Sequence, residues 1–431
     1  MKQKFNLDKE QTRIFIKYFT AGMKENGNLI LPANSSERFE NGYFLSEQSV
    51  NFKINGESVF VIWLLTFNSD HTLSSIANLN NEGNSDFELK ISGFLNDILQ
   101  NVLSLKRDKF FQRIIYRAFS GTNFMGEYWL QGIRFAQLIP EDNGTYIQGA
   151  ERLLVFDLCV DAIDESNAKE IAQEKVSDLS SILSFVMNIG LEVPYQQNRF
   201  FLMHKDNKFC MRRESTQIIS SDHYVDEMPT KGQLSSLGEF QGSVFDRLPQ
   251  MSTLICPIET RKILKGITEA SEEHKDAFRR CCKLYQLALN IGKTYPTVRI
   301  SYLCAAVEAI VKTNQEEYGS FSQFMTNYSG ENNSIHDFIY SSVRSAHFHS
   351  GSFELGEFNF DALTMNPKSS RIDENALNAE AKMRFAIFNW LNEKIAFADR
   401  RDQHFKPFET KRFSVYGMAT LGKNETDLNG T

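Results

Sequence analysis

The sequence predicts two parts of different fold class, an N-terminal α+β part with antiparallel strands and a C-terminal all-α helical bundle. Before residue 220, segments in which apolar and polar residues alternate are interspersed with segments of helical spacing. From residue 257 onward, almost every segment repeats apolar residues at the three- or four-residue spacing of an amphipathic helix. The chain has 431 residues, of which 42% are hydrophobic, enough for at least one large core.

Composition indicates where one part ends and the next begins. Residues 1–220 are expected to form an α+β domain with an unknown sensing or regulatory role. Residues 221–256 are rich in Gly, Ser, Pro and acidic side chains, which is typical of a linker. The helical domain is expected at residues 257–412, and the aperiodic residues 413–431 are expected to form a disordered tail.

The α+β part begins with an amphipathic helix and then alternates between strands and helices. Asn55-Gly56 separates two strand-like runs and favours a tight hairpin turn. The Ser-, Asn- and Asp-rich residues 69–86 predict a loop. We expect helices at Lys9–Lys24, Phe87–Leu105 and Ser166–Ile189. We expect strands at Gly42–Phe67, within Phe110–Leu138, at Glu151–Asp164, and around Arg199–Met203 and Lys208–Arg212.

The C-terminal part shows helical periodicity with short interruptions. Pro296 breaks the pattern between two of its longer helices. The polar residues 359–373 predict a loop before the last helix. We expect helices at Glu259–Glu269, Glu273–Lys293, Thr297–Lys312, Phe321–Tyr328, Ile335–Val343 and Glu374–Ala398.

Composition also limits the classes of function. The first residues are charged, and the longest apolar run, Val59–Phe67, is too short to span a bilayer. The six cysteines show neither a CxxC motif nor the spacing of a disulfide framework. A net charge of −7 argues against a general nucleic-acid-binding surface. Together these features predict a cytoplasmic protein without membrane contact.

The stretch Ser341–Gly351 (SSVRSAHFHSG) is the strongest candidate for chemistry. Arg344 carries a permanent charge that can hold a phosphate, and a histidine can transfer a proton near neutral pH. On an ideal helix, five residues leave Arg344 and His349 roughly 140° apart. Catalysis by this pair therefore requires an irregular helix or a second copy of the motif across a dimer. Taken as spacing alone, the pair also fits a solvated turn or a helix cap.

Two features of the helical part occur in the order and separation found in a known family. One is Ala306–Ile310 (AVEAI), in the centre of the second long helix. The other is Arg344 with His349, separated by four residues and followed by Ser350-Gly351. On these features the C-terminal part, roughly residues 257–400, resembles the HEPN superfamily and most closely its Apea-like branch. The resemblance implies an all-helical fold that dimerises so that both motifs line one cleft.

The resemblance also implies an activity, that of a metal-independent endoribonuclease acting as a toxin or as an antiviral (abortive infection) effector. The 2′-hydroxyl of RNA would be the nucleophile, His349 would take or deliver the proton, and Arg344 would hold the scissile phosphate. Ser345 matches the polar residue that often follows the arginine. His347 is an additional histidine that could substitute for His349 or assist it. Glu308 either positions Arg344 or is a helix-face carboxylate with a local Lys or Arg partner.

The expected partners are RNA, a second copy of the chain bound through the C-terminal domain, and an unknown trigger or regulator at the N-terminal domain. No cofactor and no metal are expected. A zinc site formed by His336, His347 and His349 is disfavoured, because no cysteine or suitably spaced carboxylate completes it. The alternative is a catalytically inactive HEPN-like module that binds a nucleotide or a partner, or serves dimerisation. Modification of the motif by a partner enzyme is a third hypothesis.

Overall fold

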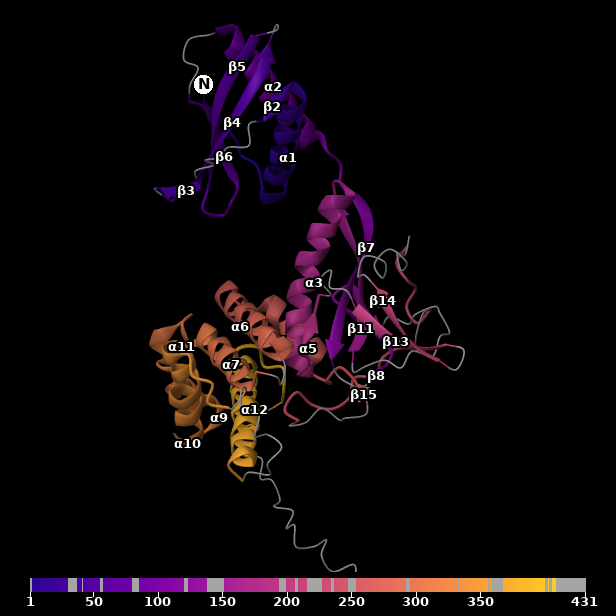
Figure 1. The fold of residues 1–431 in the computed structure, drawn as a ribbon, viewed down its shortest axis with the longest axis vertical. Coiled ribbons are helices and arrows are strands. Elements are labelled where there is room, and N and C mark those ends of the chain that lie inside the picture. The colour runs from indigo at the N-terminus through magenta and orange to yellow at the C-terminus, as the bar shows by residue number, and fades with distance from the viewer. Residues whose placement is uncertain are drawn as a thin grey trace, which may run out of the picture. The chain divides into compact units, whose positions relative to one another are not determined.

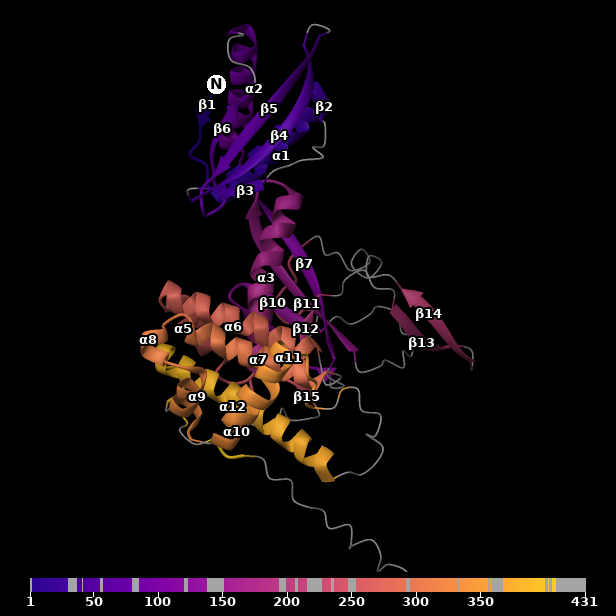
Figure 2. The same ribbon diagram turned by 60° about the vertical axis from the view of Figure 1, so that its left-hand side comes forward.

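The structure is a computed structural model of the chain, shown in two views in Figures 1 and 2. It describes residues 2–29, 37–40, 42–54, 57–79, 85–119, 123–137, 151–193, 199–205, 208–214, 227–233, 236–246, 253–291, 295–331, 333–355, 357, 367–399, 402 and 405–407. Contacts divide the chain into two compact units, Met1–Asp108 and Lys109–Thr431. The N-terminal region contains two antiparallel sheets with helices, and residues 260–395 are helical, which confirms the predicted fold class.

The first unit is an antiparallel sheet packed against two helices. The strands pair in the order β1-β6-β5-β4-β2, and β3 pairs with β4. Phe19 lies 5.4 Å from the ring of Trp63 and 6.2 Å from that of Phe94, so strand and helices share one core. The elements are β1 (Lys2–Lys4), α1 (Lys9–Asn26), β2 (Gly27–Leu29), β3 (Glu37–Glu40), β4 (Tyr43–Ile54), β5 (Glu57–Phe67), β6 (Leu73–Asn78) and α2 (Ser85–Ser104).

Strand β6 corrects one expectation, since it lies inside residues 69–86, for which a loop was expected. Its polar residues hide the strand from a pattern search, but Leu73 and Ile76 are buried. Pairing with β5 on one side and β1 on the other satisfies its backbone groups. Tertiary pairing therefore outweighs the local preference for a turn. The expected Asn55-Gly56 turn lies outside the described residues.

The second unit contains a sheet in the order β12-β7-β11-β10-β9, with helix α3 packed against one face. On β11, Phe156, Leu158 and Val160 enter the core shared with α3, whereas Val155 and Asp157 are buried on the opposite face. This split follows from the two-residue period of a strand. The elements are β7 (Asp108–Phe119), β8 (Asn123–Phe124), β9 (Glu127–Leu130), β10 (Ile133–Gln137), β11 (Glu151–Ala162), α3 (Glu165–Met187), β12 (Leu191–Glu192), and the hairpin β13 (Arg199–Lys205) and β14 (Lys208–Glu214).

Residues 236–246, here called the strap, contact the start of the edge strand β9 at Glu127 and Tyr128. The backbone N–H of Glu127 donates to Ser236 at 2.9 Å, and the N–H of Gly238 donates back to Glu127 at 2.8 Å. Val244 is fully buried, and β15 (Thr253–Leu254) then pairs with β8. The described part of the expected linker is therefore built into the second unit.

The helical region shares its core with the second sheet. Phe185 of α3 stacks on Phe388 at 4.2 Å and meets Phe278 at 5.6 Å and Tyr285 at 5.0 Å. The second sheet, α3 and the helical region thus form one core. For this reason the two compact units divide at Asp108 and Lys109 and not at the boundaries expected near residues 220 and 256. The helices are α5 (Thr260–Glu269), α6 (Glu272–Ile291), α7 (Pro296–Val311), α8 (Gln315–Tyr318), α9 (Phe321–Ser329), α10 (Asn333–Asp337), η2 (Phe338–Ser345), α11 (Ala346–Ser350) and α12 (Pro367–Ile395).

Two details of the helical region differ from expectation. Helix α12 begins at Pro367 rather than at Glu374, so the loop expected at residues 359–373 is wrong in its last part. A proline fits the first helical position because its missing N–H would have had no partner there. The helix expected at Ile335–Val343 is an α-helical turn that continues as the π-helix η2. The tail at residues 413–431 lies outside the described residues, and no described helix is long and apolar enough to cross a membrane.

Candidate functional site

The candidate site lies where the π-helix η2 meets the short helix α11, beside helix α7. Ile339 and Val343 of η2 are fully buried, whereas Tyr340 and Arg344, one position further along, reach the surface. A π-helix is rare and occurs frequently at functional sites, because its wider turn redirects side chains. The π-helix ends at Ser345, so Arg344 lies in its last turn, whereas His347 and His349 follow on the α-helical turn α11.

Arg344 is held in place by groups from two helices. Its Nη2 donates to Oε1 of Glu308 at 3.1 Å and to Oε2 at 3.2 Å, and both side chains are mostly buried. Its guanidinium carbon lies 5.3 Å from the ring centre of Tyr340 and 5.7 Å from that of Phe348. A cation over an aromatic face and a charge-assisted hydrogen bond both restrict the guanidinium. Of the two interpretations of Glu308, the geometry favours positioning of Arg344.

His347 is half-buried and surrounded by aromatic rings. Its ring centre lies 5.3 Å from that of Phe348 and 5.1 Å, edge to face, from that of Phe353. Its Nδ1 lies 3.4 Å from the carbonyl oxygen of Ser352, a long hydrogen bond. His347 is therefore restrained by two aromatic rings and at one ring nitrogen.

His349 is in a different environment. It is exposed near the end of α11, and its ring makes no hydrogen bond, ion pair or ring contact with another residue that the structure describes. Ser345 is half-buried at the junction of η2 and α11. The structure thus brings Arg344, Glu308 and His347 into one connected group, and leaves His349 outside that set of contacts.

The turn after α11 fixes the carbonyl that contacts His347. Gly351 has φ +66°, which glycine adopts without strain, and its N–H donates to the carbonyl of His347 at 3.0 Å. The N–H of Ser352 donates to Ala346 at 3.2 Å, and the Ser350 hydroxyl donates to the same carbonyl at 2.6 Å. The final Ser-Gly of the motif therefore forms the cap of α11.

His336 is not part of this group. It is buried, and burial together with the positive charge of Lys382 lowers its pKa to about 4. Lys382 is also buried, which lowers its pKa to about 8, and its Nζ donates to the carbonyl of Gly330 at 2.9 Å. Among the described residues, no group of three or more His, Cys, Asp and Glu side chains could hold a metal ion.

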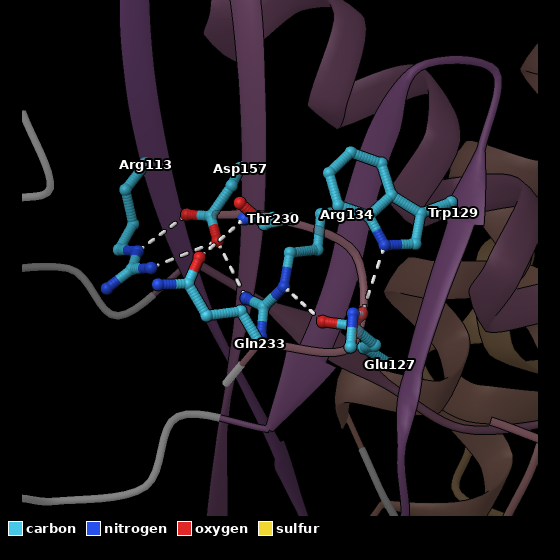
Figure 3. A network of polar contacts seen from close by, with 8 residues as sticks. Arg113, Glu127, Trp129, Arg134, Asp157, Thr230 and Gln233 are labelled. Atoms are coloured by element: carbon cyan, nitrogen blue, oxygen red, sulfur yellow. Dashed lines mark hydrogen bonds and ion pairs between the residues drawn. The ribbon is translucent and has the colours of Figure 1, made fainter. Parts of the chain in front are cut away.

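A second polar cluster, which the sequence did not reveal, crosses four neighbouring strands (Figure 3). Asp157 lies between two arginines: Arg113 Nε is 2.5 Å and Arg134 Nη1 is 2.8 Å from its carboxylate. Arg134 Nε also donates to Glu127 at 2.8 Å. The four side chains are 0–10% exposed. Only the register of the sheet brings these residues together, so no spacing in the sequence predicts the cluster.

The cluster also holds the segment that precedes the strap. Glu127 accepts a hydrogen bond from Trp129 Nε1 at 3.2 Å and another from the backbone N–H of Gly232. Although burial raises the pKa of Glu127, hydrogen bonds from Arg134 and Gly232 outweigh it and hold the pKa below its ordinary value. Two carboxylates and two guanidinium groups pair within the cluster, which suits a structural role better than ligand binding.

A cleft of about 450 Å³ opens between the β9–β10 turn and helices α3, α5 and α6. Leucine and isoleucine side chains contribute apolar surface to it. Its charged lining is mixed in sign: Lys175, Lys275 and Arg279 are positive, and Asp178 and Glu272 are negative. Such a mixture of apolar and charged lining is common in sites for small molecules.

Comparisons with protein-family models, with curated proteins and with solved structures found no match for this chain. The resemblance to the HEPN superfamily therefore rests on the motif residues and their order.

Proposed function

We propose that this chain is a metal-independent endoribonuclease whose C-terminal helical region cuts RNA. The observation that carries the proposal is the arrangement of Arg344: Glu308 holds its guanidinium beside Phe348, which in turn contacts the ring of His347. A fixed cation and a titratable ring on one irregular helical surface are the groups that phosphodiester cleavage requires.

The proposed chemistry uses the nucleophile that RNA itself carries. A histidine of the motif accepts the proton of the 2′-hydroxyl while O2′ attacks the adjacent phosphorus. Arg344 stabilises the charge that develops on the phosphoryl oxygens. The bond from phosphorus to O5′ then breaks, and the products are a 2′,3′-cyclic phosphate and a 5′-hydroxyl. O5′ takes a proton from water as it leaves, so the protein itself supplies the base and the cation.

The biological role is proposed from the family resemblance. The chain would act in the cytoplasm as a toxin or antiviral effector, and a homodimer would form through the helical region. The α+β region would sense a trigger or restrain the nuclease.

Incubation of the purified chain with end-labelled RNA in EDTA tests the activity. We expect cleavage products with cyclic-phosphate ends, and a loss of about 10²–10³-fold in rate for Arg344→Ala, which removes one charge-stabilising group. Arg280→Ala is the control, since Arg280 is an exposed arginine on α6 that donates to Thr313 at 3.1 Å. Undiminished cleavage by Arg344→Ala would contradict the proposed mechanism.

The alternative is a non-catalytic module that binds a nucleotide or a partner. The cleft of about 450 Å³ favours it, because the cleft lies on other helices than the motif and combines apolar with charged lining. Equilibrium binding of labelled nucleotides, together with a complete absence of cleavage, would support this alternative over the nuclease.

A further inference from the structure

Contacts connect Arg344 to one of the two motif histidines. The guanidinium of Arg344 lies over the ring of Phe348 at 5.7 Å, and the ring of Phe348 lies 5.3 Å from that of His347. The ring of Phe353 also lies close to His347, at 5.1 Å between ring centres. His349 takes no part in these contacts among the described residues.

Helical geometry separates the two histidines in the same way. Residues three and four apart are neighbours on a helix surface, whereas residues five apart are not. His347 is three positions after Arg344 and Phe348 is four, so both belong to the face of the guanidinium. His349 is five positions after Arg344 and is exposed.

The Ser352 carbonyl assigns the tautomer of His347. A carbonyl oxygen can only accept a hydrogen bond, so the Nδ1 that lies 3.4 Å away must carry the proton. In a neutral ring the other nitrogen, Nε2, is then an acceptor. A ring held in this tautomer before the substrate arrives is ready to accept a proton.

We infer that His347, with its proton on Nδ1, is the catalytic base of this site, and that His349 is not required for proton transfer. The inference rests on the proposed function. Nε2 of His347 takes the proton of the 2′-hydroxyl as the O2′–P bond forms. The P–O5′ bond breaks, and O5′ takes a proton from water. The imidazolium then returns its proton to solvent, so the ring emerges unchanged.

The first test compares single variants in the cleavage assay. We expect His347→Ala to lower kcat by about 10²–10⁴-fold, the usual contribution of a general base, and His349→Ala to leave kcat close to the wild-type value. Added imidazole should restore cleavage in His347→Ala, because a free base can enter the vacated space. A residue with a purely structural role would not show such rescue.

The outcomes separate this inference from the proposed function. If the wild-type chain does not cleave RNA, the result contradicts both the proposed nuclease function and the inference about His347. If the wild-type chain cleaves, then retained activity in His347→Ala overturns the inference alone. Where His349→Ala is the inactive variant, or where both variants are inactive and imidazole fails to restore His347→Ala, the inference is overturned while the nuclease stands.

The tautomer can be examined without activity. Nitrogen-15 NMR of the histidine-labelled chain distinguishes a protonated Nδ1 from a protonated Nε2, and His347→Gln identifies the resonances. We expect His347 to be the Nδ1–H tautomer when neutral, because Ser352 accepts from that nitrogen. The Nε2–H tautomer would overturn the assignment whatever the cleavage assay reports.

Discussion

The guanidinium of Arg344 donates to both carboxylate oxygens of Glu308, at 3.1 and 3.2 Å, across 36 positions of the chain. The two residues come from the two motifs that the sequence resemblance links, AVEAI on α7 and the Arg–His stretch at the junction of η2 and α11. Packing of η2 against α7 therefore converts two separate sequence features into one site.

Removal of the Glu308 carboxylate should impair both stability and cleavage. Glu308→Ala leaves the mostly buried Arg344 without its charged partner, and we expect a loss of about 1–3 kcal/mol in the free energy of unfolding. Cleavage should fall as well, because the guanidinium is no longer oriented. Denaturant unfolding and the RNA assay measure the two effects. Glu316→Ala, an exposed carboxylate on α8, is the control and should change neither.

The buried ion pairs of the second sheet should be essential for stability. Arg134→Met leaves Asp157 and Glu127 buried with one partner fewer, and we expect a loss of about 3–5 kcal/mol. Lys265→Met is the control, because its pair with Glu269 is exposed and 3.8 Å long, and it should cost less than about 1 kcal/mol. Similar unfolding midpoints for the two variants would contradict a structural role for the network.

His336 should make the protein less stable at acid pH. Its pKa is about 4 in the folded chain and about 6.5 when unfolded, so the unfolded chain binds the proton first as the pH falls. This destabilisation is absent above pH 6.5, grows as the pH falls, and reaches roughly 3 kcal/mol near pH 4.

Unfolding measured between pH 7 and pH 4 tests the role of His336. His336→Gln should flatten the pH dependence over this range, because glutamine does not titrate. An unchanged pH profile in His336→Gln would show that other groups cause the acid sensitivity.

The strap should tolerate no side chain at Gly238. A Cβ there would lie 2.3 Å from Cζ of Tyr128, a ring that is almost fully buried and hydrogen-bonded to Glu239 at 3.1 Å. We expect Gly238→Ala to lower the free energy of unfolding by about 1–3 kcal/mol. Gly93→Ala on α2 meets no atom within 4 Å and should stabilise by up to about 1 kcal/mol, because alanine is the better helix former. Equal stability of the two variants would contradict this packing.

Helices and long strands were predictable because their apolar spacing is local. The period of α3 and the alternation in β11 both appear in the sequence, and the structure places the elements within a few residues of expectation. Strand β6 was not predictable, since pairing with neighbouring strands decides it. The start of α12 is marked by Pro367, a local signal that the spacing of apolar residues does not record. The π-helix was not predictable either, because an α-helix over the same residues would show nearly the same spacing of buried side chains.

The candidate site, too, was predictable from the sequence only in part. The sequence by itself determined that Arg344 and two histidines lie close together after a helical segment, because short separations along the chain limit the distance between residues. Tertiary structure decided that Glu308 holds Arg344 and that the Ser352 carbonyl and Phe353 restrain His347 rather than His349. It also decided the ion pairs of the second sheet, which depend on strand register. Hydrogen bonds and ring contacts require positions in space to within a few tenths of an ångström, and only the packed fold supplies these.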